Sequence, residues 1–402
     1  GRRYGGAANP VVIVGAGLAG AALARALADL GVATRVIDAQ GSVAEGGSGQ
    51  PAGLLHGVVH ADDSPHTRWF RAAAQRARAV VAPLLAAGAV RGALDGLLRI
   101  EHALDRNAMQ RLLDAQALPA DYVQALSQAQ ACARAGCAVN GDAWFYPGGG
   151  WVDSRSLVRH WLHHPRIELV LRTRVARIAR TADAGWHLFD ADQRVIADAG
   201  TLVLANADGL QPLLQEPRWP LLRSRGQVTW TSEGPADWRP ALPVAGDGYA
   251  IALDDGALLC GATSDFDDDS AALRESDHRR NLDALQRLSG RAWNPPAASL
   301  DGRVAWRVHT RDRLPLLGGV PLPPSARAAS SRQDQPRFIA RDPGLHVLAA
   351  LGSRGLTQAA LAGEVVAAMI TGTPLPIGAP LLDAVDAARF AARDARVTTS
   401  TQ

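Results

Sequence analysis

Lysine is absent from the 402-residue sequence, in which all 42 basic residues are arginines. The absence excludes a Schiff-base lysine and a P-loop, since both need a lysine ammonium group. Cysteine is also scarce. Cys132, Cys137 and Cys260 cannot all pair, and no C-x-x-C motif or cysteine–histidine cluster suggests a metal site. We therefore expect no metal and a reduced, cytoplasmic environment.

Long apolar runs are missing as well. No stretch reaches the roughly 18 residues that span a bilayer, and residues 1–6 lack the apolar core of a signal peptide. The formal net charge is only +3, so composition alone does not indicate a nucleic-acid-binding protein. With 47% hydrophobic and 20% charged residues, the chain is typical of a soluble globular protein of two or three domains.

The clearest motif that is present lies near the start of the chain. Val11–Val14 is an apolar β-branched run typical of a strand buried on both faces, and Gly15, Gly17 and Gly20 follow it as G-x-G-x-x-G. A helix-forming stretch and a second strand lead to Asp38, 18 residues beyond Gly20 (38 − 20), where a carboxylate can accept from a ribose hydroxyl. This β-α-β unit predicts a nucleotide site rather than a structural glycine turn.

A second strand–glycine–helix junction lies near the end of the chain. An apolar strand at 345–350 leads to Gly352-Ser-Arg-Gly355 and then to a helix at 357–371. The free N–H groups at such a helix N-terminus stabilise negative charge, which a reduced flavin carries and a nicotinamide does not. The alternative is a plain strand-to-helix turn. Residues 221–259 alternate apolar and polar positions like an antiparallel sheet, so we expect a nucleotide domain interrupted by a substrate domain.

Four arginines occur within residues 302–318. Among them, Arg307 lies between two apolar neighbours on an expected strand. A guanidinium on a half-buried strand needs an anion, and its fork geometry suits a carboxylate. The alternative is an internal ion pair, with Asp312 as the partner. Arg354, in the second glycine junction, is another candidate for binding a carboxylate.

These motifs occur in the order seen in the D-amino-acid oxidase/glycine oxidase superfamily of FAD enzymes, which the chain resembles from about Val11 to Pro376. The motifs are Gly15–Gly20 with Asp38, Ser48–Gly53, Arg225-Gly-Gln227, Arg307 with Asp312–Pro315, and Gly352–Leu356. The chain more closely resembles the FAD-dependent oxidoreductase half of the bifunctional tRNA wobble-uridine (5-methylaminomethyl-2-thiouridine) biosynthesis proteins. That likeness involves Tyr146–Trp151, Cys260–Thr263, Asp265–Asp269, Asn281-Leu282, Arg311–Pro315 and Leu351–Thr357.

The resemblance implies a glycine-oxidase-like α/β fold, α+β overall. A Rossmann-type FAD-binding domain would be interleaved with an antiparallel-sheet substrate domain. The FAD-binding domain would comprise residues 9–88, 142–215 and 301–376, and the substrate domain residues 89–141 and 216–300. Residues 377–402 would form a C-terminal tail.

The resemblance also implies roles for individual residues. The ADP half of FAD would be held by Gly15, Gly17, Gly20 and Asp38, and the pyrophosphate by Ser48 and Gly49. Gly53 would lie close to the isoalloxazine, Val175 and Ala205 near the adenosine, and Gly352, Arg354, Gly355, Leu356 and Thr357 at the N1/O2 edge of the flavin. The predicted cofactor site also includes Ala16, Leu18, Ala19, Ala39, Gln50, Leu54, Asn206 and Ser353.

Arg307 and Arg354 match the positions at which the superfamily grips a substrate carboxylate. The implied substrate is 5-carboxymethylaminomethyl-(2-thio)uridine at the tRNA wobble position, which is in effect a glycine attached to a base. Loss of the carboxymethyl group as glyoxylate would leave 5-aminomethyl-(2-thio)uridine. Tyr249 is a further catalytic candidate; it and His56 and His60 are possible pocket residues, although each of the three is more often a structural or supporting group. Hydride loss from a neutral amine needs no catalytic base.

The sequence departs from the pattern of these relatives at two points, and two rival functions stay open. Gln50 stands where relatives often carry Asn. The methyltransferase half of the bifunctional proteins is missing, so the chain either stands alone or begins after a linker. We expect the protein to be a monomer. One rival is an oxidase of free glycine, sarcosine or a D-amino acid, and the other is a non-catalytic tRNA-binding flavoprotein. A basic surface around the site would favour tRNA, and the arginines that could form it are Arg68, Arg71, Arg76, Arg78, Arg223, Arg225, Arg311 and Arg313.

Overall fold

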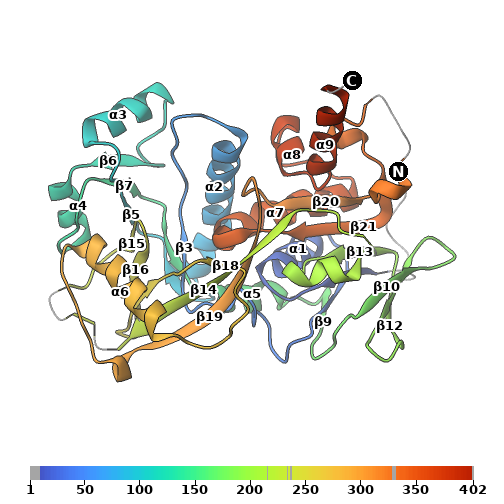
Figure 1. Cartoon of the computed structure of the whole chain (residues 1–402), viewed down its shortest axis with the longest axis horizontal. Coiled ribbons are helices and arrows are strands. Elements are labelled where there is room, and N and C mark those ends of the chain that lie inside the picture. Colours follow the sequence, from blue (N-terminus) through green and yellow to red (C-terminus); the bar gives the residue numbers. More distant parts are fainter. Residues whose placement is uncertain (1–9, 215, 233, 236–237, 328–331, 401–402) are drawn as a thin grey trace.

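The computed structural model describes residues 10–400 apart from 215, 233, 236–237 and 328–331, with the backbone alone for 397–400. A six-stranded sheet forms one half of the molecule, in the order β20-β21-β13-β1-β2-β9 (Figure 1). Every neighbouring pair is parallel except β20 and β21. These strands are β1 (Val11–Val14), β2 (Thr34–Ile37), β9 (Ile167–Val170), β13 (Thr201–Leu204), β20 (Leu316–Pro321) and β21 (Arg341–Ala349).

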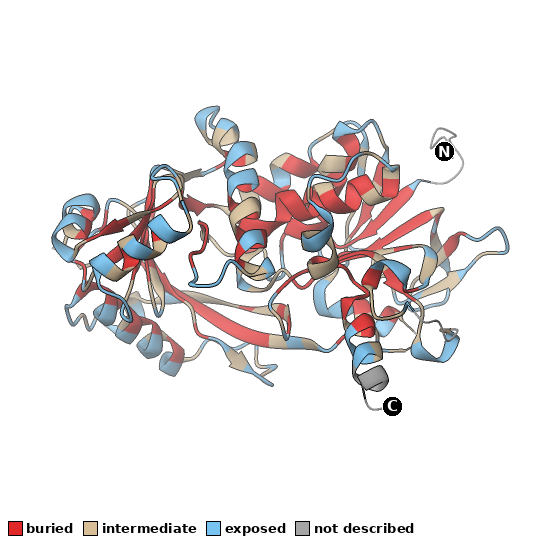
Figure 2. Ribbon diagram, turned by 90° about the horizontal axis from the view of Figure 1, so that it is seen from above, coloured by how far each residue is buried: buried red, intermediate tan, exposed pale blue. Residues whose placement is uncertain are grey.

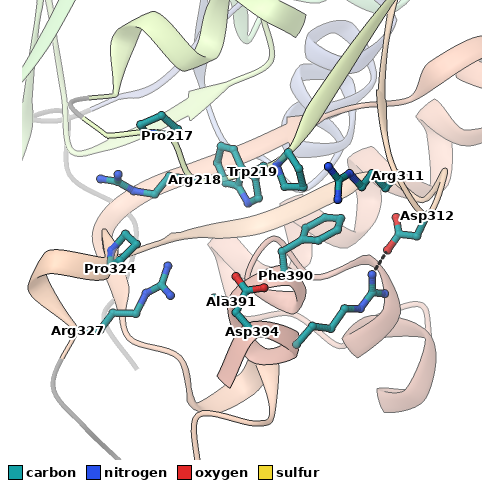
Figure 3. A pocket seen from close by; sticks show the side chains of 12 residues that line it. Pro217, Arg218, Trp219, Arg311, Asp312, Pro324, Arg327, Phe390, Ala391 and Asp394 are labelled. Atoms are coloured by element: carbon teal, nitrogen blue, oxygen red, sulfur yellow. Dashed lines mark ion pairs between the residues drawn. The ribbon is translucent and has the colours of Figure 1, made fainter. Parts of the chain in front are cut away.

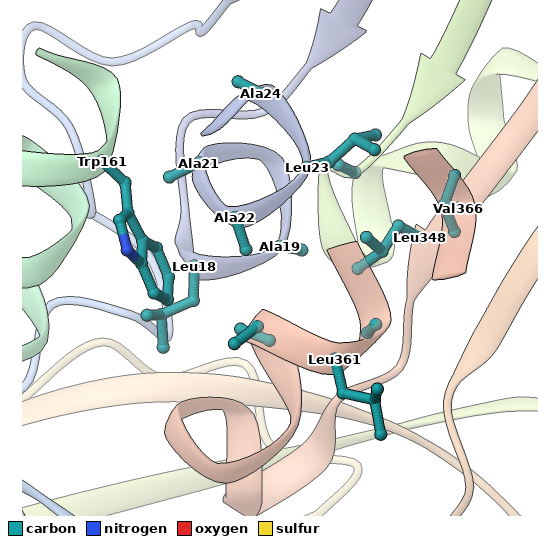
Figure 4. Close-up of a cluster of buried hydrophobic side chains, with 14 of the residues drawn as sticks. Leu18, Ala19, Ala21, Ala22, Leu23, Ala24, Trp161, Leu348, Leu361 and Val366 are labelled. Atoms are coloured by element: carbon teal, nitrogen blue, oxygen red, sulfur yellow. The ribbon is translucent and has the colours of Figure 1, made fainter. Parts of the chain in front are cut away.

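The helices that cover this sheet pack closely because their contact faces carry small residues. Four helices share one core cluster: α1 (Leu18–Asp29), α2 (Pro65–Ala86), α5 (Ser154–Leu162) and α7 (Gly355–Thr371). At Gly363 of α7, an added Cβ would lie 2.8 Å from the backbone carbonyl of Ala22 on α1. Figure 4 shows the alanines of α1 between Trp161 of α5 and Leu361 of α7. The close approach seats the N-terminal ends of α1 and α7 side by side, since Gly355 also lies against Leu18.

A second, largely antiparallel sheet forms the other half, in the order β18-β14-β17-β16-β15-β5-β7-β6, with β19 also paired to β14. Ten register pairs join β14 and β19, from Leu221–Thr310 to Trp230–Asp301, so both strands are long and run from one half of the molecule toward the other (Figure 1). The strands are β5 (Leu97–Ile100), β6 (Gln124–Leu126), β7 (Ala143–Tyr146), β14 (Leu221–Thr231), β15 (Val244–Ala245), β16 (Tyr249–Ala252), β17 (Leu258–Gly261), β18 (Asp265–Phe266) and β19 (Asp301–Thr310).

Smaller elements complete the chain. One three-stranded sheet contains β3 (Gly53–Leu55), β8 (Gly150–Val152) and β4 (Gly92–Ala93), and another contains β10 (Arg177–Arg180), β11 (Trp186–Phe189) and β12 (Val195–Ala199). Helices α3 (Arg106–Ala115), α4 (Gln128–Ala135) and α6 (Glu275–Ser289) lie with the large sheet (Figure 1). Figure 2 shows that buried residues follow the strands of both halves and line α7.

The segment expected as a C-terminal tail is helical where the structure describes it. It forms α8 (Ala379–Val385) and α9 (Arg389–Ser400), and Ala387 N–H donates to the Leu317 carbonyl of β20 at 2.9 Å. The mixed parallel and antiparallel architecture confirms the predicted α/β fold with an interleaved antiparallel sheet. The exact domain boundaries stay a prediction.

Candidate functional site: a dinucleotide cradle and two half-buried arginines

The turn after β1 has a shape that only glycine permits. Gly15 has φ +111°, and an added Cβ there would lie 2.6 Å from the Ala205 carbonyl oxygen. At Gly20, an added Cβ would lie 1.9 Å from the Gly15 carbonyl oxygen. The first and third glycines of the motif are therefore required by close backbone packing, as the sequence predicts. Ala205 itself follows β13, and its N–H donates to the Val14 carbonyl at 2.8 Å.

Predicted cofactor residues from three segments meet at the N-terminus of α1. Asp38 Oδ2 accepts from the Ala16 N–H at 2.6 Å, and its Oδ1 accepts from the Gln40 N–H at 2.8 Å. Ser48 Oγ accepts from the Leu18 N–H at 3.0 Å. The first turn of α1 carries no acidic residue, so this end of the helix keeps the positive field that suits a pyrophosphate.

Three predicted site residues carry buried side-chain atoms without a hydrogen-bond partner among the described residues. They are Gln50 Oε1, Asn206 Oδ1 and Arg354 Nη1. Buried polar atoms in proteins are nearly always paired. Five other described residues also have such an unpaired atom, so these three support a ligand only in combination with the geometry of the glycine turn. Together with the glycine turn, they show that the residues present fit a dinucleotide cofactor. Val175, also predicted, packs on the cluster that contains Val14 and Ile37 at the ends of β1 and β2.

The loop before β3 connects this cradle to the N-terminal end of α7. An added Cβ at Gly53 would lie 2.5 Å from Leu356 Cδ1, so these two predicted residues are in contact. Arg303 of β19 donates from Nη1 to the Gly46 carbonyl at 3.2 Å, and at Gly49 an added Cβ would meet its Nη2 at 2.5 Å. Sequence reasoning missed Arg303, whose only signal was its place among the four arginines of residues 302–318.

Arg307 lies on β19 opposite Ser224 of β14, with its guanidinium over the Cα of Gly226. An added Cβ at Gly226 would lie within 2.7 Å of three guanidinium atoms. Nη1 donates to the Thr263 carbonyl at 3.1 Å, and burial lowers the pKa of the Arg307 guanidinium. Burial also raises the pKa of neighbouring Tyr249 to about 12, against the opposing effect of the Arg307 charge, so this phenol stays protonated at neutral pH.

The alternative of an Arg307–Asp312 ion pair is wrong. Asp312 pairs instead with Arg389 at 2.8 Å and with Arg393 at 2.7 Å, both on α9. Although burial opposes ionisation, these two arginines and the Thr310 hydroxyl hold the pKa of Asp312 well below its usual range. In the part of the chain that the structure describes, Arg307 has no carboxylate partner.

Arg354 ends the 3-10 turn Gly352–Arg354 and directly precedes α7. Its guanidinium lies 5.5 Å from the Phe70 ring centroid, and burial lowers its pKa. Its charge also interacts with Tyr146, with a second cation, Arg99, and with Tyr122, and the ring centroids of the two tyrosines are 6.0 Å apart. A half-buried arginine beside aromatic rings, with one buried nitrogen that has no partner among the described residues, is prepared to bind an anion.

The histidines considered from the sequence surround Arg354. Burial and then the Arg354 charge hold the pKa of His56 well below its ordinary value, and its Nδ1 lies 2.6 Å from the Gly57 carbonyl. Burial likewise lowers the pKa of the half-exposed His60. Both rings are neutral at pH 7, and His56 has the structural hydrogen bond expected of a packing residue.

The expected basic surface does not form as one patch. Arg225 is fully buried and pairs with Asp277 at 2.6 Å, so its inclusion was wrong. Several others are neutralised within the protein: Arg71 by Asp63 at 2.8 Å, Arg76 by Glu364 at 2.7 Å, and Arg223 by Asp208 at 2.9 Å. Arg311 and Arg313 are exposed and have no ion pair among the described residues.

Neither a metal site nor a membrane span is found in the described part of the chain. No three histidine, cysteine or acidic side chains gather as potential metal ligands among those residues. None of the helices formed by those residues has both the length and the apolar character needed to cross a bilayer.

Several known proteins are similar to this chain in sequence. The profile of the family described as FAD-dependent oxidoreductase (DAO) matches residues 10–369. The tRNA 5-methylaminomethyl-2-thiouridine biosynthesis bifunctional protein MnmC of Methylibium petroleiphilum is 42% identical over 399 residues, covering 96% of this chain and 60% of the relative. Its counterpart in Burkholderia cenocepacia is 36% identical over 400 residues, covering 97% of this chain and 62% of that protein. The chain thus spans about 60% of the length of these curated relatives.

Solved structures share the fold. Glycine oxidase from Bacillus cereus aligns with a TM-score of 0.70 at 18% identity, covering 91% of this chain and 96% of its own. Iminodiacetate oxidase from Chelativorans sp. aligns with a TM-score of 0.70 at 23% identity, covering 94% of this chain and 98% of its own. At these identities, the likeness concerns the fold alone.

Proposed function

Because the chain belongs to the DAO family of FAD-dependent oxidoreductases, we propose that it removes the carboxymethyl group of 5-carboxymethylaminomethyl-(2-thio)uridine at the tRNA wobble position. The products would be glyoxylate and 5-aminomethyl-(2-thio)uridine. The curated relatives named for tRNA 5-methylaminomethyl-2-thiouridine biosynthesis support the substrate. The observation that carries the chemistry is Arg354, a half-buried arginine at the N-terminal end of α7 whose buried Nη1 has no partner among the described residues.

The cofactor would be held by the cradle described above. The α1 N-terminus and Ser48 would take the pyrophosphate, Asp38 the ribose, and Gly53 with the Gly352–Thr357 segment the flavin ring. When bound, FAD supplies a two-electron oxidation of the substrate amine to an imine, which water hydrolyses to glyoxylate and the primary amine.

The protein's own contribution is orientation. Arg354 and Arg307 would bind the substrate carboxylate, and the fork geometry of each guanidinium fixes its direction. Phe70, Tyr122 and Tyr146 surround Arg354 with apolar rings that exclude water and strengthen the charge interaction. Tyr249 is protonated at neutral pH and can donate a hydrogen bond there, so it is a positioning group rather than a base.

The decisive experiment mixes the oxidised flavoprotein, without oxygen, with carboxymethylaminomethyl-modified tRNA and separately with glycine, sarcosine and D-alanine. Loss of the flavin absorbance and release of glyoxylate with the tRNA alone is the expected result. Reduction by a free amino acid alone would make the protein an amino-acid oxidase. No reduction by any of them, with tRNA still bound, would make it a non-catalytic flavoprotein.

We propose that the protein acts as a monomer in the cytoplasm, where tRNA is modified. The methyl transfer that completes the modified base would come from a methyltransferase outside this sequence. Light scattering of the purified protein across a tenfold concentration range should give a constant mass of one chain.

A further inference from the structure

A cavity of about 570 Å³ lies where α9 meets the segment before β14 and the turn after β19 (Figure 3). Neither Arg307 nor Arg354 lines it, so it is separate from the site described above. Pro217, Trp219 and Phe390 form part of its wall. Its charged lining has four arginines and two aspartates, namely Arg218, Arg311, Arg327, Arg393, Asp312 and Asp394.

The negative charge of Asp312 is neutralised from within the protein. Buried Arg389, which does not line the cavity, binds both of its carboxylate oxygens, at 2.8 and 2.9 Å. Arg393 adds a second ion pair to the same carboxylate at 2.7 Å. Because Asp312 already has these partners, it cannot also balance the other arginines of the cavity.

Three of the lining arginines have no ion pair among the described residues, although the charges of Asp342 and Glu216 act on Arg218. Arg218 donates to the carbonyls of Glu216 and Pro321, and Arg327 donates to the Leu322 carbonyl at 2.8 Å. Carbonyl acceptors fix a guanidinium in place without neutralising it. Burial and then the nearby Arg218 lower the pKa of Arg327, and Asp394 opposes them. Arg311 has no hydrogen-bond or ion-pair partner among the described residues.

We propose that this cavity binds a phosphodiester group of the tRNA substrate, which extends the proposed function to a second contact. Arginine forks bind phosphate oxygens in pairs, and the net positive charge of the lining complements an RNA backbone. The location of the cavity also suits a contact with the tRNA backbone. Arg311 comes four residues after Arg307, so the two Cα atoms are at most about 14 Å apart. A base flipped into a buried site leaves the phosphates of neighbouring nucleotides at the surface, within reach of this cavity.

The test compares two double variants that remove the same charge. R311Q/R327Q changes the cavity, and R106Q/R111Q changes exposed arginines on α3, at the other end of the molecule (Figure 1). The first readout is the Kd for unmodified tRNA across a series of salt concentrations. The second is turnover of the free nucleoside 5-carboxymethylaminomethyluridine, which has no phosphate.

We expect R311Q/R327Q to weaken tRNA binding about tenfold and to lower the slope of log K against log salt by about 1 for each phosphate that the variant no longer binds. Nucleoside turnover and the flavin spectrum should not change, and R106Q/R111Q should match the wild type. Unchanged tRNA binding by R311Q/R327Q would overturn the proposal, as would an equal loss of nucleoside turnover. If wild-type protein binds tRNA through this cavity but never oxidises it, the proposed function fails and the binding site stands.

Discussion

The tripeptide Ser-Arg-Gly occurs at 224–226 and again at 353–355, and its two arginines have opposite surroundings. Arg225, on β14, is fully buried with all three nitrogens bonded: Nε to the Ser270 carbonyl, Nη1 to Asp277 and Nη2 to the Ala272 carbonyl. Arg354, before α7, is half-buried, and its buried Nη1 has no partner among the described residues, while an aromatic ring lies beside its guanidinium.

This contrast shows how a structural arginine can be told from a binding one. Moving a guanidinium out of water is costly, and a folded protein normally compensates with acceptors of its own. Arg225 receives that compensation and joins β14 to α6 and the segment before it. Arg354 receives little, so its natural partner is an anion from outside. Arg307 lies between these two cases in its hydrogen bonding, because its guanidinium has one carbonyl acceptor and no carboxylate partner among the described residues.

The strongest change is expected in stability, for Arg225→Met. The substitution leaves Asp277, whose side chain is 3% exposed, with only the half-exposed Arg280 as an ion-pair partner, and we expect a loss of about 3–5 kcal/mol in the free energy of unfolding. Urea unfolding measures it. Arg279→Met on α6, whose pair with Glu275 is 73% exposed, is the matched control and should cost no more than about 0.5 kcal/mol. Equal losses in the two variants would remove Arg225 from its structural role.

Arg354→Met should show the reverse pattern. Replacing a half-buried charge that has no ion pair among the described residues with an apolar chain should leave the unfolding free energy unchanged or raised, since no carboxylate loses a partner. The same change should lower kcat/KM about 100-fold, or roughly 3 kcal/mol, because the substrate carboxylate loses its charge partner. Flavin content by absorbance separates loss of cofactor from loss of substrate binding. A strongly destabilised variant with normal kinetics would contradict the comparison.

Asp312→Asn tests whether the ion pairs of Asp312 with Arg389 and Arg393 stabilise the protein, because that contribution should depend on pH. Asp312 has a lowered pKa in the folded state, so its ion pairs stabilise the protein above the unfolded-state pKa of about 3.9 and lose that effect as pH falls toward the lower folded-state value. We expect the wild type to exceed Asp312→Asn by about 2 kcal/mol at pH 7, with the gap closing below about pH 4. A gap that stays constant from pH 7 to pH 3 would show that the charge is not involved.

The weakest effect is expected for Gly226→Ala. The new Cβ would meet the Arg307 guanidinium at 2.6–2.7 Å, and the flexible end of that side chain must move away. We expect KM for a carboxylate substrate to rise about tenfold, or about 1.4 kcal/mol, with kcat and unfolding changed little. Gly378→Ala is the control, since its added Cβ meets nothing closer than Pro380 at 3.9 Å. If KM stays the same, Arg307 does not bind the carboxylate.

The part of the site made from neighbouring residues could be predicted from the sequence. The glycine turn, the α1 N-terminus and Asp38 come from one β-α-β unit, whose geometry its own residues dictate. Long-range pairing could not be predicted. Asp312 pairs with Arg389, which is 77 residues away on a helix where a tail was expected. Arg303 donates to a loop carbonyl more than 250 residues earlier in the chain. Such pairs depend on how distant elements pack, and no local pattern encodes that.

Binding of the substrate carboxylate by the unpaired Arg354 can be measured with an unreactive ligand. An analogue of the nucleoside, with sulfur in place of the amine nitrogen, can be made as the acid and as the carboxamide. Perturbation of the oxidised flavin absorbance gives a Kd for each. We expect wild type to bind the acid at least about 30-fold more tightly than the amide, and Arg354→Met to bind both alike. An unchanged preference for the acid in Arg354→Met would show that this arginine does not bind the carboxylate.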